Sequence, residues 1–130
     1  MPGRQVKGQR YNMFGSFFKK IKEAMTPKFD SLSPQEFGES LRKPNIQIVD
    51  ARTKGEVREG AIKGYKNIDV QQADFAPKAE KLLDKSKPVY VYCKSGMRSR
   101  MACAKLCQLG FVEVHNLSGG YMAWKSAGMK

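Results

Sequence analysis

The run Pro88–Tyr92, with the sequence PVYVY, constrains the fold of this 130-residue chain more than any other feature. It holds β-branched and aromatic residues without alternating polar positions, a pattern typical of a central parallel strand that is covered on both faces. A helix is predicted shortly after it, over Arg98–Leu109, and Gly110 would end this helix. The sequence therefore predicts an α/β fold in which helices flank a mainly parallel sheet.

Predicted strands and helices alternate along the rest of the chain. A helix over 33–42 has a strong start, because Ser33 can cap it, Pro34 suits its first position and Glu36 completes a capping box. Further helices are predicted over 53–59, 73–83 and 120–126, and strands over 46–50, 67–70 and 112–115. This alternation at short spacing supports the α/β prediction.

The formal net charge is +12, and about half of this excess lies in a short N-terminal arm. Residues 1–28 hold seven basic residues and one acidic residue. Large apolar residues recur at helical spacing over 13–25, which predicts a basic amphipathic helix that packs on the domain, contacts a membrane surface or stays mobile. Residues 1–12 are interpreted as disordered, in part as an added leader. We therefore expect an arm, 1–29, and one domain, 30–130.

The chain holds three cysteines that lie close together, Cys93, Cys103 and Cys107. Their odd number and close spacing do not fit a disulfide framework, and without paired CxxC motifs or a histidine cluster no zinc site is predicted. Free thiols, and the lack of a recognisable secretory signal, favour a cytoplasmic location. A periplasmic or membrane-surface location is left open.

Cys93 directly follows the predicted buried strand and precedes a loop, Lys94–Arg98, that leads into a helix. In open α/β sheets, ligands bind beyond the carboxyl ends of the strands. The free N–H groups and the dipole of a helix N-terminus favour a nucleophilic thiolate and can cradle a bound oxyanion. Gly96 would allow the tight turn, and Arg98 could hold an anion with two parallel hydrogen bonds. We therefore interpret Cys93 as a nucleophile rather than as a buried structural thiol.

The loop and its flanks supply the remaining candidate site residues. The predicted substrate-binding residues are Lys94, Ser95, Gly96, Met97 and Arg98, with Ser99 as a supporting residue. Met97 is expected to pack or to line the entrance of the site. Cys103 and Cys107 are predicted to face the core, with a sulfur-relaying or resolving thiol as the alternative. His115 is predicted to be structural rather than a catalytic base.

Motifs on both sides of this loop resemble the rhodanese family. Val49–Arg52 resembles the family's V-D-x-R signature, Glu56 with Gly60–Ile68 resembles its E…G-H-I-x-G-A-x-N-I stretch, and Leu117–Gly120 with Trp124 resembles its closing G-G-x-x-x-W element. The motifs occur in the family's order and cover about residues 30–128. The resemblance implies a three-layer fold with a central, mainly parallel five-stranded sheet. It also implies that Asp50 and Arg52 support the active loop.

Three positions depart from the family pattern. Ala61, Lys63 and Tyr65 stand where the family usually has histidine, proline and alanine. These positions shape a turn in the family, so we expect local repacking of the turn and no loss of chemistry.

The resemblance implies sulfur transfer. Family sulfurtransferases carry a C-x4-R loop like Cys93–Arg98, whereas related phosphatases have one residue more. The implied reaction moves a sulfane sulfur from thiosulfate or a persulfide to cyanide or a thiol, including a protein thiol, through a persulfide on Cys93. This reaction implies no metal and no organic cofactor. The alternatives are a sulfur-carrier or protein-binding module that docks through the arm, and a phosphatase or arsenate reductase. Nucleic acid is not expected as a partner, because only charge points to it.

Overall fold

A computed structural model describes residues 28–130 of the chain. The amphipathic helix predicted over 13–25, and the membrane contact expected of it, lie outside these residues. Within the described part, no helix has both the length and the apolar character needed to cross a bilayer.

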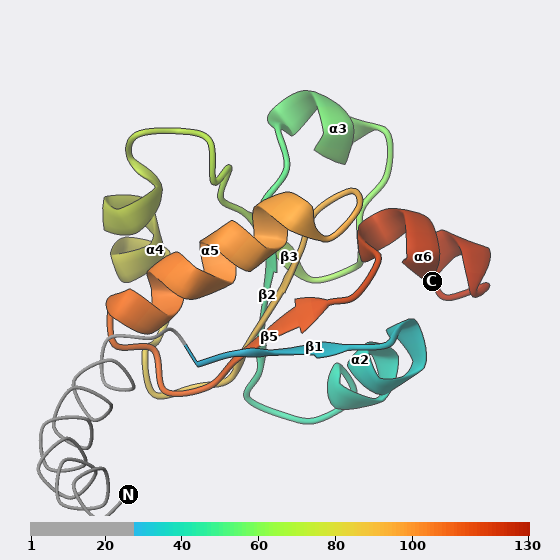
Figure 1. Cartoon of the computed structure of the whole chain (residues 1–130), viewed down its shortest axis with the longest axis horizontal. Helices are drawn as coiled ribbons and strands as arrows, with labels where there is room; N and C mark the ends of the chain where they lie inside the picture. The colour runs from blue at the N-terminus through green and yellow to red at the C-terminus, as the bar shows by residue number, and fades with distance from the viewer. Residues whose placement is uncertain (1–27) are drawn as a thin grey trace, which may run out of the picture.

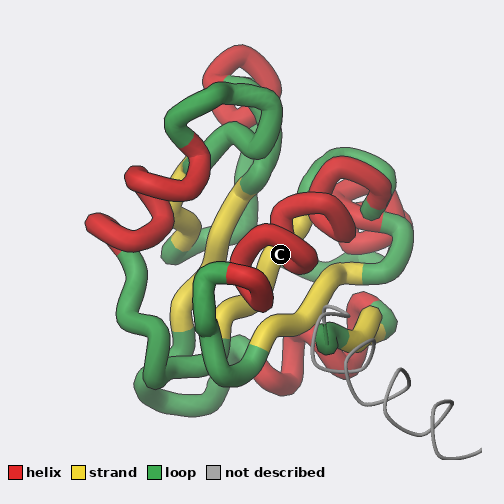
Figure 2. The backbone as a smooth tube through the Cα atoms, turned by 60° about the vertical axis from the view of Figure 1, so that its left-hand side comes forward, coloured by secondary structure: helices red, strands yellow, loops and turns green. Residues whose placement is uncertain are grey.

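Five strands and five helices make up the described domain. The strands are β1 (Asp30–Leu32), β2 (Gln47–Asp50), β3 (Tyr65–Asn67), β4 (Val89–Tyr92) and β5 (Val114–Leu117), and the helices are α2 (Pro34–Ser40), α3 (Lys54–Arg58), α4 (Phe75–Leu82), α5 (Met97–Gln108) and α6 (Gly120–Ser126). The strands form one sheet in the order β1-β5-β4-β2-β3, and every neighbouring pair is parallel. Figures 1 and 2 show the sheet in the middle with helices around it. The predicted α/β fold with a parallel five-stranded sheet is confirmed.

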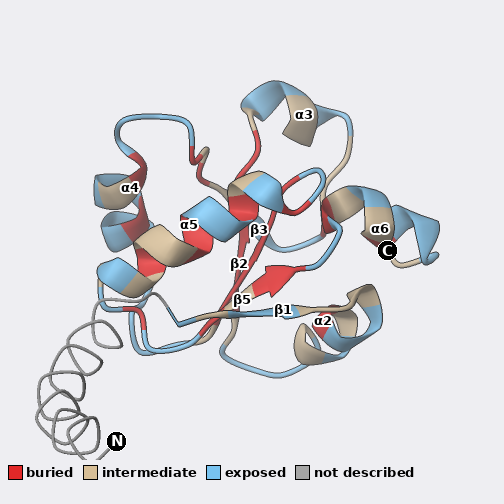
Figure 3. Ribbon diagram, in the orientation of Figure 1, coloured by how far each residue is buried: buried red, intermediate tan, exposed pale blue. Residues whose placement is uncertain are grey.

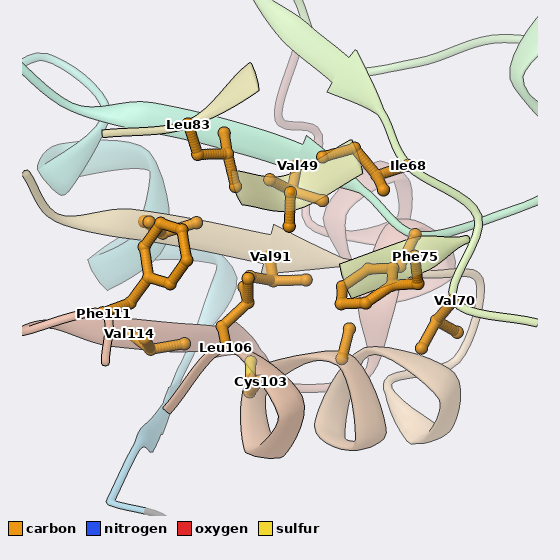
Figure 4. Packing of buried hydrophobic residues seen from close by; sticks show 14 residues of the cluster. Val49, Ile68, Val70, Phe75, Leu83, Val91, Cys103, Leu106, Phe111 and Val114 are labelled. Atoms are coloured by element: carbon orange, nitrogen blue, oxygen red, sulfur yellow. The ribbon is translucent and has the colours of Figure 1, made fainter. Parts of the chain in front are cut away.

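Strand β4 lies at the centre of the sheet, between β5 and β2, and all four of its residues are buried. Val89 and Val91 point to one face, where they pack with residues of α4 and α5 such as Phe75 and Leu106 (Figure 4). Tyr90 and Tyr92 point to the other face, where they pack with residues of α2 and α6. The absence of polar alternation in this strand follows from having two apolar faces.

The capping box predicted at Ser33 is present. The Ser33 N–H donates to Glu36 Oε1 over 2.9 Å, and the Glu36 N–H donates to Ser33 Oγ over 3.2 Å. Helix α2 ends at Ser40, slightly before the predicted end, because the turn toward Pro44 begins there.

Two strands lie away from their predicted ranges. Strand β3 covers Tyr65–Asn67 instead of 67–70, because this edge strand is largely polar, while Ile68 and Val70 enter the core as a loop. Strand β5 covers Val114–Leu117 instead of 112–115. Its polar residues His115 and Asn116 give a weak strand signal. The β-branched Val112, on which the prediction rested, lies outside the strand and is 71% exposed.

No strand was predicted over Asp30–Leu32, where the structure has β1. This edge strand has three residues and pairs with β5 from His115 to Leu117. It forms by pairing with a distant segment, so its local sequence carries little strand signal.

Candidate active site

Cys93 follows the last residue of β4, at the carboxyl end of the sheet, as predicted. Its side chain is buried, with 0% of its surface exposed. The thiol sulfur accepts a hydrogen bond from the Gly96 N–H over 3.1 Å and one from Ser99 Oγ over 3.3 Å. Ser99 lies in the first turn of α5 and is also buried. The loop and the start of α5 therefore place two hydrogen-bond donors on one sulfur, an arrangement that stabilises negative charge on it.

Gly96 caps α5 with φ +99°, a backbone conformation that other residues rarely adopt. A Cβ at this position would lie 3.2 Å from the Gly119 nitrogen and 3.4 Å from the Leu117 carbonyl oxygen. Glycine is therefore needed both for the turn and for the close approach of the segment that follows β5.

Helix α6 holds the active loop from the other side. The Tyr121 N–H donates to the Cys93 carbonyl oxygen over 2.8 Å, and the Met122 N–H donates to the Lys94 carbonyl oxygen over 3.0 Å. Gly120 allows this contact, because a Cβ there would lie 2.5 Å from the Lys94 carbonyl oxygen. The first N–H groups of α6 thus find their partners in the active loop.

The guanidinium of Arg98, which the sequence predicts to hold an anionic substrate, is paired with Glu56 in the structure. Arg98 Nη1 donates to Glu56 Oε1 over 2.7 Å, and Arg98 Nη2 donates to Glu56 Oε2 over 2.8 Å. The hydrogen bonds from Arg98, with support from Thr53, lower the pKa of Glu56 to about 2. The same pairing raises the pKa of Arg98. The two parallel hydrogen bonds predicted for an anionic substrate are therefore made to a carboxylate of the protein.

Asp50 and Arg52 form a buried ion pair at the end of β2. Arg52 Nη2 lies 2.7 Å from Asp50 Oδ2 and also donates to the Gly60 carbonyl oxygen over 2.6 Å. The Arg52 guanidinium lies 4.6 Å from the centre of the Tyr121 ring and 5.4 Å from that of Tyr92. The pair thus connects the end of β2 with α6, the helix that holds the loop.

A cleft of about 180 Å³ opens beside the active loop. It is lined by Arg52, Glu56, Glu59, Lys94, Tyr121, Met122 and Lys125. Lys94, Ser95 and Met97 are exposed on the loop itself. Packing was one of the two roles expected for Met97, but 76% of its surface is exposed.

The other two cysteines and the histidine lie apart from this loop. Cys103 packs in the core between the sheet and α5, and burial raises its pKa. Cys107 is partly buried, its pKa is also raised by burial, and its thiol donates to the Lys28 carbonyl oxygen. His115 is bonded to Asp30 and Glu113 at the edge of the sheet. These contacts agree with the core-facing and structural roles predicted from the sequence.

The sequence did not identify Tyr121 or Lys125 as cleft residues, and it indicated Glu56 only through a family motif. One local signal for Glu56 exists, because Thr53 and Glu56 form a capping box at the start of α3, like the one before α2. No local signal pairs Glu56 with Arg98, which lies 42 positions further along the chain. Such a pair becomes visible only in the folded domain.

The described domain is similar to known proteins. The rhodanese-like domain family matches residues 33–127. The chain is 33% identical over 100 residues to the thiosulfate sulfurtransferase GlpE of Shewanella oneidensis. This match covers 76% of this chain and 95% of that protein.

Two solved structures are also similar. The rhodanese-like domain of the Anabaena sp. protein Alr3790 has a TM-score of 0.69 and 28% identity, and the match covers 76% of this chain and 75% of that one. The polysulfide-sulfur transferase homodimer of Wolinella succinogenes has a TM-score of 0.65 and 30% identity, with 89% of this chain and 87% of that one covered. The family match spans most of the domain, and the parallel sheet ends in the Cys93 loop. This chain therefore belongs to the rhodanese-like domain family.

Proposed function

We propose that this protein is a sulfurtransferase that carries a sulfane sulfur as a persulfide on Cys93. The observation that carries the proposal is the Cys93 sulfur at the carboxyl end of β4, with the Gly96 N–H and the Ser99 hydroxyl both donating to it. Sulfur transfer in general is supported by the family and by the names of the relatives. Thiosulfate or a persulfide as donor, and cyanide or a thiol as acceptor, are our proposal for this chain.

The first step is a displacement at sulfur. The Cys93 thiolate attacks the outer sulfur of thiosulfate and forms a new sulfur–sulfur bond. The sulfur–sulfur bond of thiosulfate breaks, and sulfite leaves with the electron pair. The donors that face the Cys93 sulfur, together with the N-terminus of α5, stabilise the negative charge of the thiolate and then of the persulfide.

The second step releases the sulfur. Cyanide or a thiolate attacks the terminal sulfur of the persulfide, the bond to the Cys93 sulfur breaks, and the Cys93 thiolate is restored. The products are thiocyanate or a new persulfide on the acceptor. The enzyme alternates between two covalent forms, so ping-pong kinetics are expected.

Access to Cys93 depends on the loop, because the side chain has no exposed surface in the structure. Lys94, Ser95 and Met97 form the outer side of this loop. We propose that these residues shift to admit the donor and that Lys94 attracts its negative charge. Once formed, the outer sulfur of the persulfide extends the reactive group beyond the Cys93 sulfur toward the acceptor.

Arg98, Asp50 and Arg52 are assigned to positioning rather than to contact with substrate. The Arg98–Glu56 pair ties the first turn of α5 to α3, and the Asp50–Arg52 pair supports α6 through the Tyr121 ring. Both pairs hold the elements between which the active loop lies.

Steady-state kinetics with thiosulfate and cyanide test the proposal. The wild type should give the parallel double-reciprocal plots of a ping-pong reaction, and Cys93→Ser should reduce turnover to background. Cys107→Ser is the matched control and should keep the wild-type rate, because this thiol contacts Lys28 and not the loop. Turnover by Cys93→Ser would overturn the proposal. A wild type that fails with both thiosulfate and a persulfide donor would favour a binding module instead.

A further inference from the structure

We propose that the exposed surface around the Cys93 loop docks an acidic protein that presents the acceptor thiol. We call this surface the methionine face, and it consists of Met97 and Met101 of α5, Met122 of α6, and the basic residues Lys94 and Lys125. The inference rests on the proposed sulfur transfer and names the partner that would receive the sulfur.

The first observation is where the large exposed apolar side chains lie. In the described part of the chain there are six, and three of them are the methionines of this face, Met97, Met101 and Met122. Met101 and Met122 have 56% and 53% of their surface exposed. The other three, Tyr65, Leu82 and Val112, are spread over β3, α4 and the turn before β5. Exposed apolar residues therefore gather near the active loop.

The three methionines adjoin the loop from two helices. Met97 and Met101 are four positions apart in α5, so they lie on the same face of the helix. Met122 is joined to the loop through its N–H, which donates to the Lys94 carbonyl oxygen, and it lines the same cleft as Lys94. Figure 3 shows the exposed outer sides of α5 and α6 next to the loop that connects β4 to α5.

Methionine suits such a surface because its flexible, polarisable side chain adapts to different partners. Apolar side chains that gather on a surface near a reactive group, rather than standing singly, indicate an interaction site. The methionines therefore favour a partner with apolar side chains of its own, which indicates a protein.

The second observation is the charge around the loop. The segment from Cys93 to Ser126, which contains the loop, α5 and α6, holds five basic residues and a single acidic one, Glu113. Glu113 is bonded to His115 and lies just before the amino end of β5, at the opposite end of the sheet from the loop. Helices α5 and α6 contain no acidic residue at all. On the rim of the cleft, the charge of Glu56 is balanced by Arg98, so Glu59 is the acidic group that opposes Lys94 and Lys125. This balance attracts an acidic partner and repels a basic one.

The third observation is the size of the cleft. Its volume of about 180 Å³ is below the range of about 300–1,000 Å³ that is usual for sites which enclose a small molecule. The cleft is therefore too small to enclose a large acceptor, and we place most of the contact with such an acceptor on the exposed methionine face.

Binding of short synthetic peptides to the full chain tests the proposal. One peptide carries a central serine in place of cysteine among leucine, aspartate and glutamate residues, and its counterpart has lysines in place of the acids. Fluorescence anisotropy on the unloaded protein should show that the acidic peptide binds at least about tenfold more tightly. The arm, residues 1–29, is also basic, so variants of the methionine face are needed to show where the peptide binds.

Met101→Ser should weaken binding of the acidic peptide about fivefold, because it removes apolar surface that the peptide would cover. Lys125→Glu should weaken it by a similar factor and reduce its dependence on salt. The matched controls are Val112→Ser and Lys43→Glu, which lie on other surfaces and should leave the affinity within about twofold of the wild type. Met101→Ser should also keep the wild-type rate with thiosulfate and cyanide.

Equal affinity for the two peptides, or Met101→Ser behaving like Val112→Ser, would overturn the proposal. A DNA oligonucleotide of the same charge is a further control. The proposal would also be overturned if this oligonucleotide bound as tightly as the acidic peptide and Met101→Ser did not change its affinity, because the surface would then attract any polyanion. Peptides that contain cysteine complete the test, with transfer of sulfur from the loaded protein followed by mass spectrometry. Failure to load Cys93 would contradict the proposed function, whereas loading without preference for the acidic peptide would contradict only the docking surface.

Discussion

At the scale of single residues, Gly96 and Gly120 decide how closely the active loop and α6 approach each other. Both have positive φ angles, and a Cβ at either position would come close to backbone atoms. The contact at Gly120 is the tighter one, at 2.5 Å from the Lys94 carbonyl oxygen. Because that carbonyl accepts the Met122 N–H, a side chain at Gly120 would disturb the loop that carries Cys93.

We predict that Gly120→Ala lowers the free energy of unfolding by at least about 3 kcal/mol, since it adds a backbone clash to an unfavourable φ angle. The matched control is Gly128→Ala. Gly128 has a φ angle of +74°, similar to +64° at Gly120, but a Cβ added at Gly128 would have no neighbouring atom within 4 Å. It should cost about 1 kcal/mol. Urea unfolding measures both, and equal losses in the two variants would contradict the clash.

His115 gives the edge of the sheet a dependence on pH. Its ring stacks on Tyr90, and its two nitrogens bond to the carboxylates of Asp30 and Glu113. Burial alone would lower the pKa of His115, but the hydrogen bonds that the ring donates to Glu113 and Asp30 outweigh burial and raise the pKa above 6.5. A raised pKa means that the folded protein binds the proton more tightly than the unfolded chain does.

This contribution to stability is therefore fully present below pH 6.5 and is lost as the pH rises through the pKa of the folded state. We predict a loss of up to about 1 kcal/mol, because both carboxylates are exposed. Urea unfolding on either side of this range, for the wild type and His115→Gln, measures it. The difference between the two proteins should shrink at the higher pH, and a difference that does not change with pH would contradict the account.

At the scale of secondary-structure elements, the Glu56–Arg98 pair joins α3 to the start of α5. Glu56→Gln should lower the free energy of unfolding by about 1–2 kcal/mol, because a bidentate, partly buried pair loses its charge. It should also reduce kcat/KM for thiosulfate about tenfold, since the first turn of α5 then positions the loop less well. Glu39→Gln, at an exposed position of α2 that does not line the cleft, is the control and should change neither quantity.

The pH dependence of this pair has the opposite sign to that of His115. The pKa of Glu56 is about 2 in the folded protein against 4.5 ordinarily. The stability from the pair is therefore complete above pH 4.5 and is lost as the pH falls toward 2. The gap between the wild type and Glu56→Gln in urea should close over that range, and a constant gap would show that the carboxylate charge does not matter.

The elements that could be predicted from the sequence are those with strong local signals. Ser33 and Glu36 mark the start of α2, and the apolar run of β4 marks the centre of the sheet. Strands β1, β3 and β5 were missed or displaced, because they hold polar residues and form through pairing with distant segments. The pairing of Arg98 with Glu56 could not be predicted for the same reason, because the two residues are 42 positions apart in the sequence.

At the scale of the whole molecule, the sheet separates two apolar cores. One lies under α4 and α5 and includes Leu106, and the other lies between α2 and α6 and includes Phe37 and Trp124. Strand β4 contributes residues to both cores, and its carboxyl end leads to Cys93. The position of the active loop therefore depends on packing on both faces of the sheet.

We predict that Leu106→Ala lowers the free energy of unfolding by about 2–5 kcal/mol, because it leaves a cavity in the core beneath α5. Leu82→Ala, at an exposed position of α4, is the matched control and should cost less than about 1 kcal/mol. Urea unfolding compares the two. A similar loss in both would contradict the assignment of the core to the α5 side of the sheet.

The sequence allowed the class of the whole fold to be predicted, because four motifs occur in the order typical of the family. It did not predict how the molecule distributes its exposed methionines and basic residues around the loop. That arrangement depends on α5 and α6 meeting at Cys93, a contact made by Gly96, Gly119 and Gly120 in the folded domain.

The most direct test of the central claim is the intact mass of the protein after treatment with thiosulfate. The account predicts that the wild type gains one sulfur atom, that cyanide removes it, and that Cys93→Ser gains none. Gain of sulfur by Cys93→Ser would contradict the account, and so would a wild type that gains no sulfur from either thiosulfate or a persulfide donor.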